Sequence, residues 1–64
     1  MKNPDYVNWN EDCGLRAEVY KEDRGVRMIL RDTDACAVVG NKLFTHKPFD
    51  EVKQYADLCL CFEY

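Results

Sequence analysis

Hydrophobic and polar residues alternate with a period of two over residues 15–21 and again over residues 26–32. This period is typical of β-strands with one face buried against a core and the other turned to solvent. We therefore predict two strands here. The inward positions are Leu15, Ala17, Val19, Val26, Met28 and Leu30.

The segments that flank these strands carry turn residues. Residues 22–25, Glu-Asp-Arg-Gly, predict a hairpin loop, because Gly25 can adopt a positive φ. Residues 32–34, Asp-Thr-Asp, predict a second turn, because Asp side chains accept hydrogen bonds from the backbone amides that follow. Ile29 breaks the polar pattern of the outward positions and indicates that this face is partly covered.

A third strand is predicted from about residue 35 to residue 45, with Gly40-Asn41 in its middle. This pair can form a tight hairpin turn, which would leave two short strands, 36–39 and 42–45. It can also mark a bulge within one long strand. We favour the single bent strand and leave the hairpin as the alternative.

The last part of the chain predicts an amphipathic helix over residues 48–61. Pro48 suits the first helical turn, where its missing N–H costs nothing. Asp50 and Glu51 lie near the N-terminus, where the helix dipole favours negative charge. Apolar side chains then recur at helical spacing and form one stripe. The stripe consists of Phe49, Val52, Tyr55, Ala56, Cys59 and Leu60.

Residues 1–14 read as an irregular N-terminal arm, since Asn, Pro, Asp and Gly are frequent in it. It carries two aromatic residues, Tyr6 and Trp9. We expect Trp9 to lie over the core as a lid. The alternative is an exposed anchor for a partner, because Trp and Tyr are enriched in binding hot spots.

Together these elements predict one α+β domain spanning residues 1–64. Its parts are the arm 1–14, an antiparallel β-meander over 15–45 and the helix 48–61, in the order βββα. The meander has three strands, or four if Gly40-Asn41 is a turn. A chain of 64 residues buries a modest fraction of its surface on folding, so a partner or a second copy would add stability.

Charge and targeting signals narrow the function classes. The net charge is −3, with both signs mixed, which argues against disorder and against a general nucleic-acid binder. The N-terminal residues lack the apolar segment of a signal peptide, and no apolar run reaches the roughly 20 residues of a membrane span. We expect a cytoplasmic protein without a membrane partner, whose four cysteines stay reduced.

We predict no catalytic residue, no metal site and no cofactor. Cys59 and Cys61, two apart on a helix, point about 200° away from each other, and the chain has a single histidine, His46. Cys36 lies ten residues before His46, too far for a nucleophile and its base on one strand. All three glycines are isolated, so no phosphate-binding loop is present.

The outward face of the predicted hairpin carries Arg16, Arg27 and Arg31 beside Tyr20. Basic residues around an aromatic resemble a stacking platform for single-stranded nucleic acid. Glu18 shares this face, however, and cross-strand Glu–Arg pairs explain the same residues without a ligand. Nucleic-acid binding is therefore disfavoured and is kept as an alternative.

These features favour a small non-enzymatic protein-binding module, an inhibitor or regulator that blocks a partner's surface. In size, charge and compact α+β build the chain is similar to the small acidic proteins with which phages block host defence enzymes, anti-CRISPR inhibitors among them. This likeness involves no residue motif and implies no residue roles. A homodimer serving as an accessory domain is a further alternative. The expected partner-binding residues are Tyr6, Trp9, Glu11, Asp12, Glu22 and Asp23.

Overall fold

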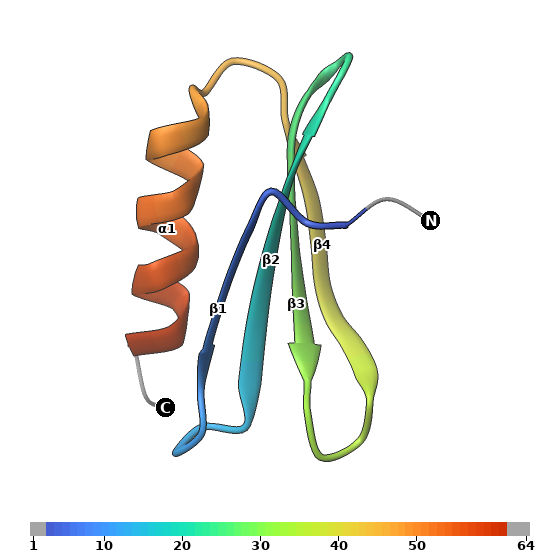
Figure 1. Ribbon diagram of the computed structural model, residues 1–64, viewed down its shortest axis with the longest axis vertical. Helices are drawn as coiled ribbons and strands as arrows, with labels where there is room; N and C mark the ends of the chain where they lie inside the picture. The colour runs from blue at the N-terminus through green and yellow to red at the C-terminus, as the bar shows by residue number, and fades with distance from the viewer. Residues whose placement is uncertain (1–2, 62–64) are drawn as a thin grey trace.

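The computed structural model describes residues 3–61 and has a four-stranded antiparallel sheet with one helix packed on one face (Figure 1). The strands lie in the sheet in chain order, β1-β2-β3-β4, which confirms the small α+β meander closed by a C-terminal helix. The elements are β1 Tyr6–Asn10, β2 Leu15–Glu22, β3 Gly25–Asp32, β4 Ala37–Phe44 and α1 Phe49–Cys61.

The two strands with the clearest alternation, β2 and β3, form the centre of the sheet. They pair antiparallel from Leu15 opposite Asp32 to Glu22 opposite Gly25, and Asp23 and Arg24 make the turn. Gly25 has a φ of 155°, and a Cβ atom at this position would collide with the carbonyl oxygen of Phe44. The turn therefore requires glycine for its backbone conformation and for the close approach of β4.

The fourth strand comes from a segment that we expected to be irregular. Residues 6–10 form β1 and pair with β2, from Tyr6 opposite Val19 to Asn10 opposite Leu15. The prediction of an irregular arm over 1–14 is thus wrong for these five residues. The β1–β2 connection contains Gly14, whose φ of 65° fits a tight turn.

β4 runs without interruption through Gly40 and Asn41 and pairs with β3 along its length. The register shifts between Leu30 and Arg31, which are opposite Gly40 and Val38, so Val39 is the extra residue of a β-bulge. The favoured single bent strand is confirmed, and the hairpin alternative at Gly40-Asn41 is wrong. The bulge bends the strand so that its two halves follow the twist of the sheet.

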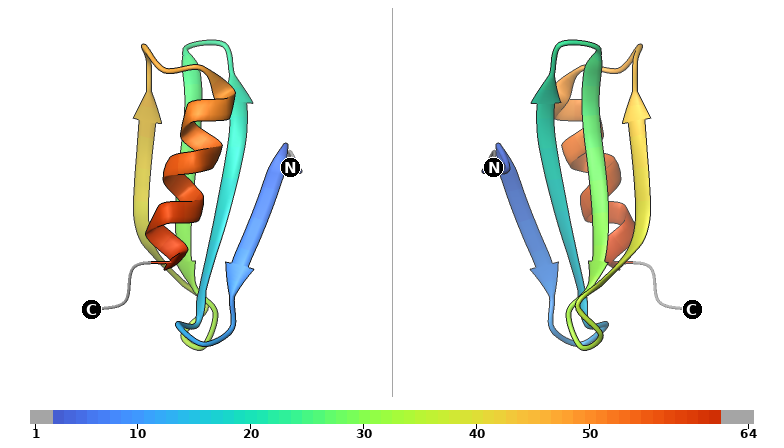
Figure 2. Two further views of the ribbon diagram at one scale, coloured as in Figure 1. Left: turned by 90° about the vertical axis from the view of Figure 1, so that its left-hand side faces the viewer. Right: turned by 90° about the vertical axis from the view of Figure 1, so that its right-hand side faces the viewer.

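The helix packs mainly against β2 and also contacts β1 and β3. In Figure 2 it lies over the middle of the sheet, between β4 on one side and β1 on the other. It begins at Phe49, and the Pro48 carbonyl oxygen accepts hydrogen bonds from the backbone N–H groups of Glu51 and Val52, at 3.1 and 3.2 Å. Pro48 is thus the residue before the first helical position. Among the described residues, α1 is the only helix, and it is neither long nor apolar enough to cross a membrane.

The core lies between α1 and the sheet, and its inward strand positions are those predicted from the alternation. One member of the predicted helix stripe departs from it: Tyr55 is 44% exposed and lies on the flank of α1 nearest β4. The buried core residues are Ala17, Val19, Val26, Met28, Phe44, Val52, Ala56 and Leu60.

Polar side chains fasten β1 to the helix on the covered face. The Tyr6 hydroxyl and the Asn8 amide donate hydrogen bonds to Asp57 Oδ1 at 2.7 and 2.9 Å. Asn10 Nδ2 donates to the Leu60 carbonyl at 2.8 Å, where the last turn of a helix has unsatisfied oxygens. The hydrogen bond to Asp57, together with burial, raises the pKa of Tyr6.

Candidate functional site

The sheet face opposite α1 is the surface on which exposed aromatic, arginine and aliphatic side chains gather. We call it the open face, because no helix or strand of residues 3–61 packs over it (Figure 2). Strand register determines its members, since residues opposite each other in an antiparallel pair share a face. The open face consists of Val7, Trp9, Arg16, Glu18, Tyr20, Glu22, Arg27, Ile29, Arg31, Val38, Asn41 and Leu43.

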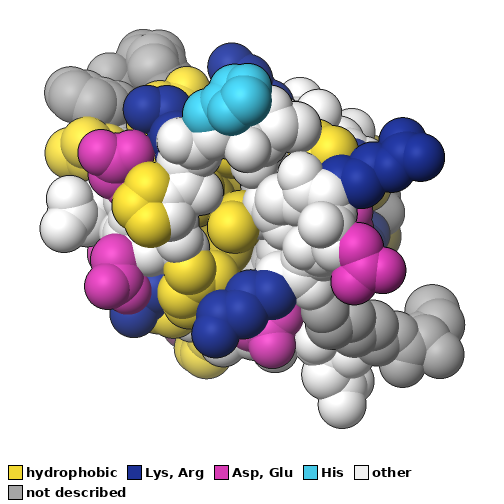
Figure 3. Space-filling view, turned by 90° about the horizontal axis from the view of Figure 1, so that it is seen from above, with side chains coloured by type: hydrophobic (Ala, Val, Ile, Leu, Met, Phe, Trp, Pro, Cys, Tyr) yellow, Lys and Arg dark blue, Asp and Glu magenta, His cyan; other side chains and the backbone are white. Residues whose placement is uncertain are grey.

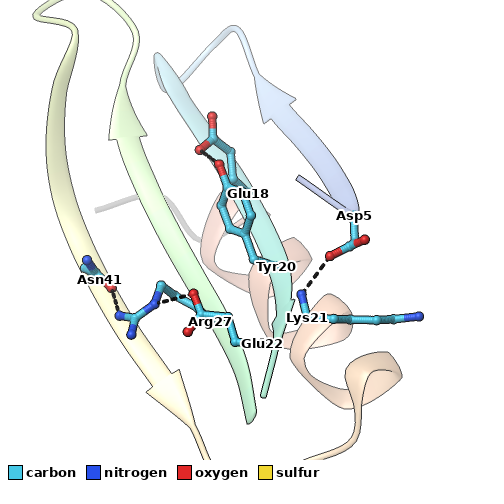
Figure 4. Close-up of polar contacts among 7 residues, drawn as sticks. All are labelled: Asp5, Glu18, Tyr20, Lys21, Glu22, Arg27 and Asn41. Carbon is cyan, nitrogen blue, oxygen red and sulfur yellow. Dashed lines mark hydrogen bonds and ion pairs between the residues drawn. The ribbon is translucent and has the colours of Figure 1, made fainter. Parts of the chain in front are cut away.

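Glu18 lies at the centre of the open face and is only 5% exposed. Its Oε1 atom accepts hydrogen bonds from the Tyr20 hydroxyl at 2.8 Å (Figure 4) and from Arg31 Nε at 3.1 Å. Its Oε2 atom lies 3.0 Å from Arg16 Nε. One carboxylate therefore holds an aromatic side chain and two guanidinium groups of the open face.

Arg16 and Arg31 are directly opposite each other in the β2–β3 register, a position where like charges repel. The Glu18 carboxylate offsets this repulsion by pairing with both. The Arg16 contact is an ion pair without hydrogen-bond geometry, because Arg16 Nε is buried and donates to no acceptor in the described chain. Both guanidinium groups remain partly accessible, with side chains 43% and 40% exposed.

The electrostatics of this cluster keep Glu18 ionised at neutral pH. Burial alone would raise the pKa of Glu18. Hydrogen bonds from Tyr20 and Arg31, with the charges of Arg31 and Arg16, outweigh burial and lower the pKa below its ordinary value. Burial and the adjacent Glu18 raise the pKa of Tyr20, and Glu18 raises the pKa of Arg31. Chemically, Glu18 acts as a charge partner that positions its neighbours.

A second polar group ties the other end of the open face together across three strands. Arg27 Nε donates to Glu22 Oε2 at 2.9 Å, and Arg27 Nη1 donates to Asn41 Oδ1 at 2.7 Å (Figure 4). Glu22 belongs to β2, Arg27 to β3 and Asn41 to β4. All three arginines of the face are thus bound to residues of the face itself.

Apolar side chains border the arginines. Trp9 is 58% exposed and is opposite Arg16, and Val38, opposite Arg31 on the far side, is 50% exposed. One row across the sheet therefore reads Trp, Arg, Arg, Val. The expectation that Trp9 closes the core as a lid is wrong, because Trp9 lies on the face away from the helix. Ile29 is half-buried, although no helix or strand of the described residues packs over this face. The partial cover predicted for Ile29 therefore comes from neighbouring side chains.

The structure does not bring the predicted partner-binding residues onto one surface. Tyr6 faces the helix, where it bonds Asp57. Glu11 and Asp12 are exposed in the β1–β2 turn, whereas Glu22 and Asp23 lie at the opposite end of β2. Of the six residues, Trp9 and Glu22 share the open face. Arg16, Arg27 and Arg31 do lie on one face with Tyr20, as their alternation indicates.

The remaining reactive side chains are dispersed. Cys36 and Cys59 are free thiols, and Cys13 Sγ donates to the Leu60 carbonyl oxygen at 3.9 Å. The side chain of Cys61 lies outside the described part. His46 is exposed in the loop between β4 and α1, at the end of the molecule that Figure 3 views. Within residues 3–61, no three His, Cys, Asp or Glu side chains gather as metal ligands do.

The sequence does contain a signal for the position of Trp9. Residues 7–10, Val-Asn-Trp-Asn, alternate strictly, and three of the five residues 6–10 are good strand formers. Comparison of the chain with models of protein families, with curated proteins and with solved structures gave no match.

Proposed function

We propose that this chain is a small non-enzymatic protein-binding module, an inhibitor or regulator of the phage anti-defence kind, and that the open face is its contact surface. The observation that carries the proposal is Trp9, 58% exposed on an uncovered sheet face and opposite Arg16. Trp, Tyr and Arg are the residues most enriched at binding hot spots. An exposed Trp beside two ordered arginines matches that composition.

The Glu18 cluster adds support, because it positions binding side chains before any partner arrives. Arg31 and Tyr20 are held by hydrogen bonds of 3.1 and 2.8 Å, and Arg16 by an ion pair of 3.0 Å. Ordering a long side chain on binding costs about 0.5–1.5 kcal/mol. Side chains that are already held lose less of this freedom, so contacts through Arg16 and Arg31 contribute more of their energy to affinity.

A second candidate is a single-stranded nucleic-acid binder on the same face. It is favoured by the location of Arg16, Arg27 and Arg31 on one face that also carries Trp9 and Tyr20. Protein binding is the better supported of the two, because Glu18 and Glu22 already pair with these arginines and the chain carries a net charge of −3. A nucleic-acid surface needs cationic groups free to contact phosphates.

The test begins with affinity capture of binding proteins from lysate and their identification by mass spectrometry. The affinity of the captured protein is then measured for the wild type, for Trp9→Ser, for Arg31→Gln and for the control Arg24→Gln. Arg24 is exposed in the β2–β3 turn, so its variant removes the same charge away from Arg16 and Trp9. We expect Trp9→Ser and Arg31→Gln to weaken binding at least tenfold and Arg24→Gln to leave it unchanged.

Two outcomes would contradict the proposal. Wild-type affinity in both Trp9→Ser and Arg31→Gln would show that the open face is not the contact surface. Binding to single-stranded oligonucleotides that weakens steeply with salt and is lost in the same variants would support the nucleic-acid candidate instead.

A further inference from the structure

A groove on the covered side of the molecule, between α1 and β4, is distinct from the open face. Its volume is about 360 Å³. Tyr55 and Leu58 on the helix flank are 44% and 52% exposed, and Tyr55 packs edge-on against Phe44 of β4 at 5.5 Å between ring centroids. Phe44, Tyr55 and Leu58 thus give the groove an apolar part, and charged or polar side chains line the rest of it. Its main lining residues are Lys42, Phe44, Lys47, Glu51, Tyr55 and Leu58.

β4 forms one edge of the sheet, and no other strand of residues 3–61 pairs with its outer side. It is eight residues long, against five for β1 at the opposite edge. Natural edge strands are usually protected by short length, charge, proline or a β-bulge. Ala37–Phe44 contains no proline and one charged residue, Lys42, and Val38 and Val39 are 50% and 58% exposed. The β-bulge at Val39 interrupts this edge, so the regular row of backbone groups suited to another strand is residues 40–44.

An exposed edge next to an apolar groove is the arrangement in which an extended peptide adds a strand to a sheet. Backbone hydrogen bonds hold such a peptide, and alternate side chains point to the same side. On one side, these side chains would meet Tyr55 and Leu58, which the domain leaves exposed. We propose that β4 and this groove bind an extended segment of another protein as a fifth strand, with apolar side chains at alternate positions.

Charge narrows the sequence of that segment. Lys42 Nζ lies 5.2 Å from the centroid of the Phe44 ring, and no described carboxylate pairs with it. Lys47 pairs with Glu51 at 3.6 Å. The groove therefore holds two lysines against one glutamate. Lys42 is opposite Met28 and so faces the covered side. An acidic residue at one of the groove-facing positions of the segment, close to Lys42, therefore completes the charge balance.

The same charges disfavour a second copy of this chain as the occupant. Two copies that pair antiparallel over the whole regular segment 40–44 place Lys42 of one copy directly opposite Lys42 of the other. The two lysines would then lie on one face, with Cβ atoms about 4.5–5.5 Å apart. Like charges at this spacing repel, whereas an acidic segment removes the repulsion.

The test uses a capped six-residue peptide, Val-Thr-Glu-Thr-Val-Thr, titrated into ¹⁵N-labelled protein. Its valines and its glutamate occupy alternate positions and so point to the same side of the added strand, the side of Tyr55, Leu58 and Lys42. We expect saturable chemical-shift changes in β4 and on the Tyr55–Leu58 flank, and none around Trp9. Three comparison peptides are used. One replaces glutamate by lysine. The other two carry N-methyl groups on alternate backbone amides, one on the odd-numbered and one on the even-numbered residues. We expect at least tenfold weaker binding for the lysine peptide. We expect the same for one of the two methylated peptides, the one whose N-methyl groups replace the amide hydrogens that would bond to β4.

Protein variants complete the test. Lys42→Glu is expected to weaken binding of the valine–glutamate peptide at least tenfold. Arg24→Glu, the same charge reversal at an exposed turn residue that does not line the groove, is expected to leave its affinity unchanged. Absence of shifts in β4 at millimolar peptide would overturn the proposal. Equal binding of both methylated peptides would overturn strand addition. Dimerisation in light scattering, with the same β4 shifts in the absence of peptide, would make a second copy the occupant and overturn the proposal as well.

Discussion

The two faces of the sheet bury their central residues by different means, and β2 shows both. Ala17 and Val19 point to the covered face and are fully buried under α1. Glu18, between them in sequence, points to the open face and is 5% exposed, although no element covers it. The covered face is closed by a hydrophobic layer. At the centre of the open face, Glu18 is shielded from solvent and is paired with Tyr20, Arg31 and Arg16.

This difference predicts different energetics for the two faces. Burial of apolar side chains contributes about 25 cal/mol per Å² and requires close packing but no specific angles. A buried carboxylate loses solvation, and only well-placed hydrogen bonds and opposite charges offset that cost. The covered face should therefore be sensitive to side-chain volume, and the open face to the removal of single polar atoms.

The largest effect is expected on the covered face. Met28 is 4% exposed in the core, and Met28→Ala should lower the free energy of unfolding by about 2–4 kcal/mol through lost burial and a residual cavity. Ile29→Ala is the matched control, because Ile29 is its half-buried neighbour on the open face. Urea denaturation measures both. A loss for Ile29→Ala as large as for Met28→Ala would remove the distinction between the faces.

On the open face, Glu18→Gln should have the largest effect, about 1–3 kcal/mol. The substitution keeps the size of the side chain but removes the charge that offsets the repulsion of Arg16 and Arg31. Glu22→Gln is the control, because it breaks an exposed pair with Arg27, and such pairs contribute about 0–1 kcal/mol. If chemical denaturation gives equal losses for the two variants, the Glu18 cluster is an ordinary surface ion pair.

The covered face could largely be predicted from the sequence. Leu15, Ala17 and Val19 alternate with polar residues, and the stripe of α1 recurs at helical spacing, because both periods follow from backbone geometry. The strand β1 could not be predicted in the same way, because its polar residues face the helix and its tryptophan faces solvent. Asn8 and Asn10 face the helix, where they bond Asp57 and the Leu60 carbonyl, whereas Trp9 faces outward.

The open face could be predicted only in part. Alternation placed Arg16, Glu18 and Arg31 on one side and indicated cross-strand pairs, of which the Glu18–Arg31 pair is present. The burial of Glu18 could not be predicted. It depends on side chains of two strands folding over one carboxylate, and no local pattern encodes such a tertiary contact. The same holds for the groove beside β4, which depends on where α1 lies across the sheet.

The pH dependence of stability gives a smaller effect that isolates the charge of Glu18. The pKa of Glu18 is lowered in the folded state, so its contribution is present above the ordinary value of 4.5 and is lost as the pH falls through the lowered value. The difference in unfolding free energy between wild type and Glu18→Gln should therefore narrow as the pH falls below about 4.5. Denaturation at a series of pH values from 7 to 3 measures it. A difference that stays constant would show that Glu18 contributes through shape and not through charge.

The smallest effect on stability is expected for a substitution of Trp9. Its size tests whether Trp9 contributes to the stability of the fold. Trp9 is 58% exposed and lies outside the core cluster. Trp9→Thr keeps a good strand former and should change the free energy of unfolding by about 0.5 kcal/mol or less. So small a change would agree with the proposed role of Trp9 in binding rather than in folding. If denaturation shows a loss of about 2 kcal/mol or more, Trp9 packs as a structural residue, and the main support for a binding surface on the open face is removed.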